Sequence, residues 1–357
     1  MLENDAINLS DLLDRPQNIV NNAHELNSFY KNQIVLITGA GGSIGSELSK
    51  QIYNYQPKKL ILLDIYENSV YDLQMYFEHL SKSVNNNVVV HVVIGSVYNK
   101  HRMVSVFETY TPTMVFHAAA YKHVPLMEDN GVEAVRTNLI GTYNIFELSK
   151  KYKVGHVLLV SSDKAVRPTN IMGLTKHYAE LMMRYFQYST NDTTYNAVRF
   201  GNVINSNGSV IPLFMKQIKN GGPVTVTHPE ITRYFMTIPE AVSLILESLL
   251  YGVGGDIFIL DMGKPIKILD LAKLMIEKYS TKPIEIKFIG LRPGEKLFEE
   301  LLIDKYAFKT FHDRIFLDTS EVDLFKSNVI DIIQSFNACN EDVIQEIAKQ
   351  LFLELNQ

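Results

Sequence analysis

A strand followed at once by spaced glycines is the feature that most limits how this chain can fold. Residues 33–38 form an apolar run typical of a buried strand, and a helix is expected to start near Ser43 and run through Ile52. The glycines between them allow a tight turn and the close approach of a pyrophosphate to the helix N-terminus. This context predicts a dinucleotide site. The residues expected to bind the cofactor here are Gly39, Gly42, Ser43, Ile44 and Gly45.

The next predicted strand, 59–63, ends at Asp64, about twenty residues beyond the last of these glycines. A carboxylate at this point can accept hydrogen bonds from the adenosine ribose hydroxyls and repels a 2′-phosphate, which favours NAD over NADP. The alternative is a strand-terminal acid that caps a turn.

Strands alternate with helices from residue 33 to residue 199, which predicts an α/β fold with a Rossmann-type, doubly wound parallel sheet. Ligands of such sheets bind at the carboxyl ends of the strands. Residues near these ends that are expected to contact the cofactor are Ser96, Ala118, Ala119 and Asn138. Lys122 and His123 are expected to overhang the site and contact the substrate. His117 and His123 lack a nearby Cys or carboxylate cluster, so no metal site is predicted.

An acid and an amine follow the apolar run 157–160, where a strand should end and a loop begin. Asp163 and Lys164 are a candidate acid/base pair, with Ser162 beside them. Lys176 lies four residues beyond Met172, so the two share a helix face and can point into one cleft. Taken alone, Asp163 and Lys164 could equally be a solvated turn with a weak surface ion pair.

Polar loops in the second half of the chain suit phosphate or sugar. The substrate-binding candidates are Asn202, Ser209, Val210, Arg233, Arg292 and Glu295. Arg233 and Arg292 are candidate clamps on an anionic ligand, and Glu295 is a candidate partner of ribose hydroxyls. A packed surface charge is the alternative for Arg233.

Composition limits the class of protein. The chain has 357 residues, 46% of them hydrophobic, and a formal net charge of -5, which gives no reason to expect a nucleic-acid partner. The single cysteine, Cys339, excludes an intrachain disulfide and fits a reducing compartment. We find neither a signal-peptide pattern nor an apolar run long enough to cross a bilayer, and therefore expect a cytoplasmic protein without a membrane span.

Together these motifs resemble the extended short-chain dehydrogenase/reductase family, and within it the UDP-N-acetylglucosamine 4,6-dehydratases of bacterial polysaccharide biosynthesis. The segments that carry the resemblance are 39–45, 118–125, 161–176, 200–203 and 291–296. It extends from residue 33 to about residue 315 and is similar to the catalytic part of that branch standing alone.

The resemblance implies an NAD-dependent lyase, acting on UDP-N-acetylglucosamine in surface-glycan synthesis and forming a homo-oligomer. The length and the order of the predicted elements suggest the domain limits. We expect an N-terminal arm at 1–30, an NAD-binding Rossmann domain at 31–204 to which 236–262 returns, and a smaller C-terminal α/β nucleotide-sugar-binding lobe at 205–235 and 263–357. The arm should contain a short amphipathic helix with Leu9, Leu12 and Leu13. Whether the arm packs on this chain or on another subunit stays open.

One position departs from the general family pattern. Met172 stands where the family has a tyrosine four residues before the lysine, and a thioether cannot accept a proton. Methionine resembles the subgroup that retains configuration at C5 of the sugar. The candidates for deprotonating the 4-hydroxyl are Asp163, Ser162 and a water held by Lys176.

In the mechanism implied by the resemblance, Lys164 as a neutral amine removes the C5 proton, and protonated Asp163 gives a proton to the departing C6 hydroxyl. Lys176 holds the nicotinamide ribose. Two alternatives stay open: a 4-epimerase, which needs no acid and base near C5 and C6, and a catalytically inactive dinucleotide-binding protein, suggested by Met172.

Overall fold

The computed structural model describes residues 22–83, 86–301, 307–320, 329–336 and 340–355. The helix predicted around Leu9, Leu12 and Leu13 lies outside these residues, as does Cys339.

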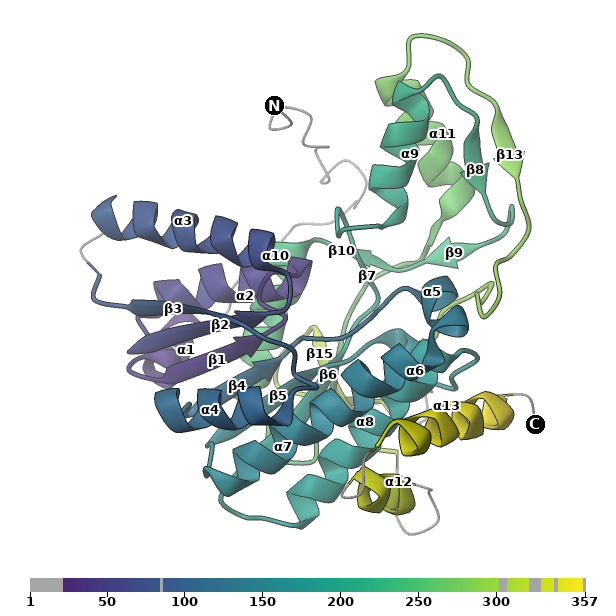
Figure 1. Cartoon of the computed structure of the whole chain (residues 1–357). Helices are drawn as coiled ribbons and strands as arrows, with labels where there is room; N and C mark the ends of the chain where they lie inside the picture. The colour runs from purple at the N-terminus through teal and green to yellow at the C-terminus, as the bar shows by residue number, and fades with distance from the viewer. Residues whose placement is uncertain (1–21, 84–85, 302–306, 321–328, 337–339, 356–357) are drawn as a thin grey trace.

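A nine-stranded sheet forms the centre of the molecule, in the order β14-β15-β11-β6-β5-β4-β1-β2-β3 (Figure 1). Seven neighbouring strands pair in parallel: β1 Ile34–Thr38, β2 Lys59–Asp64, β3 Val89–Ile94, β4 Met114–His117, β5 His156–Val160, β6 Thr194–Arg199 and β11 Ile257–Leu260. The chain reverses its direction of winding between β1 and β4, and the carboxyl ends of these strands open onto a crevice there. The predicted Rossmann-type sheet is confirmed.

Helices cover both faces of the sheet, because its buried strands are apolar on both sides. One face carries α1 Ala23–Tyr30, α2 Ser43–Asn54, α3 Glu67–Ser83 and α10 Ile238–Ser248. The other carries α4 Lys100–Tyr110, α7 Gly141–Lys151 and α8 Ile171–Tyr188. Alternation along β1 shows the two layers: Val35 and Ile37 pack on the first face, whereas Leu36 packs on the second.

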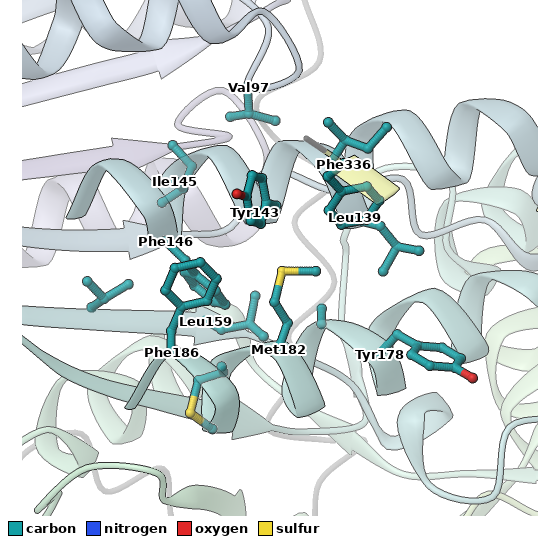
Figure 2. Packing of buried hydrophobic residues seen from close by; sticks show 14 of the residues in the cluster. Val97, Leu139, Tyr143, Ile145, Phe146, Leu159, Tyr178, Met182, Phe186 and Phe336 are labelled. Carbon is teal, nitrogen blue, oxygen red and sulfur yellow. The ribbon is translucent and has the colours of Figure 1, made fainter. Parts of the chain in front are cut away.

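Aromatic rings join the helices of the second face to the sheet (Figure 2). Phe186 of α8 packs against Phe146 and Tyr143 of α7, with ring centroids 5.7 Å and 5.8 Å apart. Tyr195 of β6 meets Phe146 at 5.3 Å. This packing holds α8, the helix that carries Met172 and Lys176, on this face of the sheet.

The helical segment before β5 is longer than expected. It begins with α5 Val124–Asp129 and α6 Gly131–Ala134 and passes through a π-helical segment, Val135–Ile140, before α7. The residues from Thr137 onward have the pattern that predicts the start of this helix, whereas helical structure begins already at Val124. Wide π-helical turns often occur near functional sites, and this one carries Asn138.

A smaller lobe lies beyond the carboxyl end of the sheet (Figure 1). It contains α9 Val210–Lys219, α11 Ile268–Tyr279 and two short strand pairs: β8 Val224–Val226 with β13 Ile286–Phe288, and β9 Thr232–Arg233 with β12 Ile266–Lys267. A further pair, β7 Asn202–Val203 with β10 Phe235–Met236, lies at the junction, because Val203 and Met236 pack into the core of the large unit. Ile211, Phe214 and Met275 belong to the separate apolar core of the smaller lobe.

The prediction that all of 263–357 belongs to this lobe is wrong. β15 Ile315–Asp318 pairs with β11, β14 Ala307–Lys309 pairs with β15, and both extend the main sheet in antiparallel direction. The helices α12 Val329–Ser335 and α13 Glu341–Leu355 pack against α8. Each of these segments has a physical reason to return. The open edge of β11 offers unpaired peptide groups, and the apolar stripe of α13 needs a partner.

Within the range predicted as an arm, α1 packs on the chain's own large unit. Leu26 and Tyr30 are fully buried, and the Tyr30 hydroxyl donates a hydrogen bond to the Leu246 carbonyl of α10 (2.8 Å). Among the described helices, none combines the length and apolarity that crossing a bilayer requires.

We predict that Leu351→Ala lowers the free energy of unfolding by about 2–4 kcal/mol, because it removes a buried side chain from the contact of α13 with the large unit. Leu353→Ala is the matched control, since Leu353 lies on the same helix with half its surface exposed. Urea unfolding of both variants checks this. Equal stabilities would contradict the packing of α13 described above.

Candidate active site

A cleft of about 870 Å³ lies between the strand ends and the smaller lobe. Of the residues predicted to bind the cofactor, those that line it are Gly39, Gly42, Ser43, Ile44, Gly45, Asp64, Ser96, Ala118, Ala119 and Lys176. The predicted substrate-binding residues all line it as well: Lys122, His123, Asn202, Ser209, Val210, Arg233, Arg292 and Glu295. Ser162, Lys164 and Met172 complete the set, whereas Asp163 and Asn138 are not among the lining residues.

The glycine loop is shaped to bring backbone close to a ligand. Gly39 has φ +70°, and a Cβ there would lie 2.6 Å from the Ala119 backbone nitrogen. A Cβ on Gly45 would overlap the Gly39 carbonyl oxygen. The first amides of α2 have no side-chain cap and border the cleft, so this helix N-terminus fits a pyrophosphate.

Asp64 has the position expected of a ribose ligand, and it also holds the loop. Its Oδ2 accepts a hydrogen bond from the Gly41 N–H (2.8 Å), and its Oδ1 accepts one from the Tyr66 N–H (2.9 Å). The turn-capping role considered as the alternative is therefore present. Because each carboxylate oxygen has a second lone pair, Asp64 can still accept from a ribose hydroxyl.

Asn138 lies beneath the wall of the cleft. Its Oδ1 accepts from the Tyr121 N–H (2.9 Å), and its Nδ2 donates to the Tyr121 carbonyl (3.1 Å) and to Thr175 Oγ1 (3.0 Å). The side chain is 1% exposed and is fully used in fixing the loop after β4 to α8. The predicted contact of Asn138 with the cofactor is not supported, because its hydrogen bonds hold the loop.

Local hydrogen bonds position the segment after β5. The Ser162 hydroxyl accepts from the Lys164 N–H (3.2 Å) and caps the short 3₁₀ turn Asp163–Ala165. Asn170 caps α8 through its Oδ1, which accepts from the Gly173 N–H (2.7 Å). Together they set where Lys164 and Met172 enter the cleft.

Lys164 is held between two carboxylates. Its Nζ lies 3.0 Å from Asp163 Oδ1 and 2.8 Å from Glu299 Oε1. The Ser162 hydroxyl donates to the same Asp163 oxygen (2.6 Å). Asn202 Nδ2 donates to Glu299 Oε2 (2.9 Å), and Arg233 Nε lies 3.2 Å from Glu299 Oε1. The alternative of a solvated turn is therefore wrong: Lys164 is partly buried, and both of its carboxylate partners are buried.

Burial and neighbouring charges shift the pKa values of this cluster in opposite directions. Burial alone would lower the pKa of Lys164, but Asp163 and Glu299 outweigh it, so the pKa is raised. Burial alone would raise the pKa of Asp163, yet the Lys164 charge and the neighbouring hydrogen bonds lower it. Burial raises the pKa of Glu299 to about 7; Asp163 adds to this, and Lys164 and Arg233 oppose it. The two carboxyls therefore differ in their affinity for a proton.

Arg233 borders the cleft but is engaged by protein groups. Its NH2 lies 3.3 Å from Glu295 Oε1 and donates to the Lys296 carbonyl (2.9 Å), while its NH1 donates to the Thr232 carbonyl (2.7 Å). With Glu299 on Nε, the guanidinium fixes the loop after β13 to β9. The predicted anion clamp is better represented by Arg292, which is 54% exposed and pairs with Glu295 at 3.2 Å.

The side chains of Lys122 and His123 both have lowered pKa values. Burial, followed by the charge of Lys164, lowers the pKa of Lys122. Burial, followed by Lys122 and Arg292, lowers the pKa of His123. His123 is therefore neutral near pH 7, and an anion at this place would meet the positive charges of Lys122, Lys164 and Arg292.

A second helix N-terminus borders the cleft at α9. Ser209 precedes this helix, and its hydroxyl is buried without a hydrogen-bond partner among the described residues. An orphaned buried hydroxyl at a helix N-terminus suits an anionic ligand group. Asn207, from the same loop, donates its N–H to Ser43 Oγ (3.2 Å) at the start of α2.

Met172 packs into an apolar cluster with Met127, Ala134 and Ile171 and is 2% exposed. Lys176, one turn further, is buried and donates to the Val160 carbonyl (2.9 Å). No cluster of three or more metal-ligating side chains occurs in the described part of the chain.

Glu299 is the site residue that sequence reasoning missed. It follows the 291–296 motif and precedes Glu300, which pairs with Arg167 at the surface. Nothing in that local pattern distinguishes one glutamate from the other. Only the folded chain brings Glu299 to Lys164, 135 residues earlier in sequence.

We predict a pH signature for buried Lys176. Burial lowers its pKa to about 8, with Glu180 opposing the shift. Between this value and the unfolded value of about 10.4, the unfolded chain binds a proton that the folded chain does not, so raising the pH favours the folded state. The unfolding free energy of wild type relative to Lys176→Met should therefore rise by up to about 1.4 kcal/mol per pH unit in this window.

Chemical unfolding at several pH values between 8 and 10 checks this, and Lys153→Met, at an exposed lysine, is the control. A difference between wild type and Lys176→Met that stays constant with pH would contradict the burial of an ionisable amine at this position.

Comparison with known proteins places this cleft in a family context. CapD of Staphylococcus aureus, a capsular polysaccharide biosynthesis protein, is 46% identical over 327 residues, which cover 91% of this chain and 53% of CapD. This chain thus spans about half of CapD's length. The UDP-glucose 4-epimerase of Rickettsia rickettsii is 35% identical over 276 residues, covering 76% of this chain and 78% of the epimerase.

The X-ray structure of Pen from Bacillus thuringiensis is similar in fold, with a TM-score of 0.75 and 37% identity, covering 82% of this chain and 90% of Pen. Residues 35–319, which include the sheet, the cleft and the Asp163–Lys164–Glu299 cluster, match the family of polysaccharide biosynthesis proteins. This chain belongs to that family.

Proposed function

We propose that this chain is a UDP-N-acetylglucosamine 4,6-dehydratase that uses NAD and retains the configuration at C5. The observation that carries the proposal is the ionisable cluster of Asp163, Lys164 and Glu299 at a cleft that also contains a glycine loop for a dinucleotide. A simple hydride transfer at C4 does not need this cluster. Removal of water does, because one group must take a proton from C5 and another must protonate the leaving hydroxyl.

The glycine loop and Asp64 would hold the dinucleotide, with its pyrophosphate at the N-terminus of α2 and its ribose at the carboxylate. The cofactor supplies a hydride acceptor for C4 and the hydride donor for C6 when bound. Lys176, buried beside the strand ends, is the candidate partner of the nicotinamide ribose.

Lys164 is the candidate base for the C5 proton. Its side chain is 23% exposed and borders the cleft. Asp163 is the candidate acid, and the Ser162 hydroxyl would carry its proton to the cleft. As the Ser162 hydroxyl gives its proton to the leaving C6 oxygen, it takes one from Asp163 along the 2.6 Å contact. The departing group is then water.

The substrate diphosphate fits the opposite side of the cleft. The N-terminus of α9 at Val210 offers donors, as does the Ser209 hydroxyl, which has no hydrogen-bond partner in the part of the chain that the structure describes. Lys122 and Arg292 offer positive charge. The name of CapD, a capsular polysaccharide biosynthesis protein, supports a product destined for surface glycan. The homo-oligomer and the C5 retention implied by Met172 stay predictions from the resemblance.

A 4-epimerase is the second candidate function, since a UDP-glucose 4-epimerase is among the relatives. Mass spectrometry of the product separates the two. An epimer has the mass of its substrate, whereas the dehydratase product is lighter by one water. A product of unchanged mass from UDP-N-acetylglucosamine would favour the epimerase.

We predict that Lys164→Met abolishes incorporation of solvent deuterium at C5, because a thioether cannot exchange a proton with that carbon. Proton NMR of the sugar nucleotide in deuterated buffer checks this. Lys153→Met is the control: this lysine also pairs with an aspartate, Asp192, but does so at the surface. Incorporation at the wild-type rate in Lys164→Met would remove Lys164 from the role of base.

A further inference from the structure

Because Met172 stands where the family has a tyrosine, the proposed reaction needs another group to take the proton of the sugar 4-hydroxyl. When the sugar C4 is oxidised, its hydroxyl loses a proton as well as a hydride, and Met172 cannot accept that proton. The proton must be held until the cycle ends, because the starting charges of the site have to be restored. A group with a proton affinity near neutral pH, in contact with Lys164, could hold it.

We infer that Glu299 is this proton-holding residue: acting through Lys164, it takes up the proton released from the 4-hydroxyl and returns it at the end of the cycle. The inference rests on the proposed function. Glu299 is not required to touch the sugar itself, so its role is to position and exchange a proton on Lys164.

The geometry supports a direct exchange. Glu299 Oε1 lies 2.8 Å from Lys164 Nζ, closer than Asp163 Oδ1 at 3.0 Å. The Glu299 side chain is 4% exposed, which keeps bulk water from competing for the proton. Asp163 Oδ2 is buried without a hydrogen-bond partner among the described residues, and a proton on Glu299 would place a donor next to that carboxylate.

Charged and polar groups from each neighbouring element determine how strongly Glu299 binds a proton. The 3₁₀ turn after β5 contributes Asp163 and Lys164, β9 contributes Arg233, and β7 contributes the amide of Asn202. Lys296, on the segment of Glu299 itself, adds a positive charge nearby. The balance of burial and these charges raises the pKa of Glu299 to about 7, whereas that of Asp163 is lowered. Glu299 is therefore the carboxyl able to exchange a proton near neutral pH.

Each proton transfer balances. Lys164 Nζ first passes one of its protons to Glu299 Oε1, and the lone pair that this frees takes the proton of the O4–H bond as that bond breaks. Lys164 is then again an ammonium, and Glu299 is a neutral acid. With only one carboxylate left beside it, Lys164 gives a proton to Asp163 and becomes the neutral base. Elimination then moves the C5 proton to Lys164 and the Asp163 proton to the leaving oxygen.

The second half of the cycle restores the charges. Lys164 returns a proton to C5 as hydride reaches C6, which leaves the amine neutral. The O–H bond of Glu299 then breaks, and its proton goes to Lys164. Asp163 and Glu299 are again carboxylates and Lys164 is again an ammonium.

Glu299→Gln tests the inference, because the amide keeps the size and a hydrogen-bond acceptor but cannot take a proton. We expect transient cofactor reduction on mixing with UDP-N-acetylglucosamine, followed by near-ultraviolet absorbance, to slow by about a hundredfold or more. In the wild type this step should slow as the pH falls through about 7, since protonated Glu299 cannot accept. In Glu299→Gln this pH dependence should be absent.

Two further variants make the outcome decisive. Glu299→Asp keeps an ionisable group and should retain a pH dependence at a shifted midpoint, which serves if Glu299→Gln fails to fold. Glu300→Gln, at the neighbouring surface glutamate, should match the wild type. A Glu299→Gln protein that is slower at every pH but keeps the wild-type midpoint would overturn the inference, because a structural role has that signature.

A measurement without substrate or cofactor provides an independent readout. Carbon-13 NMR of labelled glutamate carboxyls, with the Glu299 signal assigned by its loss in Glu299→Gln, should show a midpoint near 7. A midpoint in the ordinary range of about 4 to 5 would overturn the inference. If the wild type reduces no cofactor and makes no keto-sugar, the proposed function itself fails. Normal turnover with a pH-insensitive Glu299 defeats only the proton-holding role.

Discussion

The ion pairs of the Lys164 ammonium with the buried carboxylates of Asp163 and Glu299 are the interaction on which the site depends. Removing one partner of a buried ion pair typically costs about 3–5 kcal/mol, because the remaining charge is left without compensation. The three residues come from two distant parts of the chain, the turn after β5 and the segment after β13. This cluster therefore joins the turn at the edge of the large sheet to the segment that follows β13.

Other contacts also join the two sides of the cleft. Arg233 of β9 ties Glu295 and Glu299 to the lobe, and Asn202 of β7 supplies the second donor to Glu299. On the far side, Asn207 reaches Ser43 at the start of α2. The cleft is bordered by groups whose positions are already set by hydrogen bonds, which reduces the reorganisation needed when charge moves during a reaction.

Sequence alone could predict the parts of this molecule that local physics determines. The apolar run 33–38 with its glycines predicted β1 and α2, and the position of Asp163 and Lys164 after a strand predicted a place at the ligand edge. It could not predict Glu299, because Glu299 and Glu300 have the same local surroundings in sequence and differ only in what the folded chain brings to them. The roles of Arg233 and Asn138 could not be predicted for a similar reason, because their hydrogen-bond partners are set by tertiary packing. The return of β15 to the sheet escaped prediction because it depends on an open strand edge 55 residues earlier, at Leu260.

A proton NMR time course of the wild-type protein with NAD and UDP-N-acetylglucosamine in deuterated buffer tests the removal of water most directly. We expect a new C6 methyl signal, deuterium at C5, and ring couplings of the retained configuration. Appearance of only the C4 epimer, or an unchanged sugar nucleotide, would contradict the assignment of the Asp163–Lys164–Glu299 cluster to the removal of water.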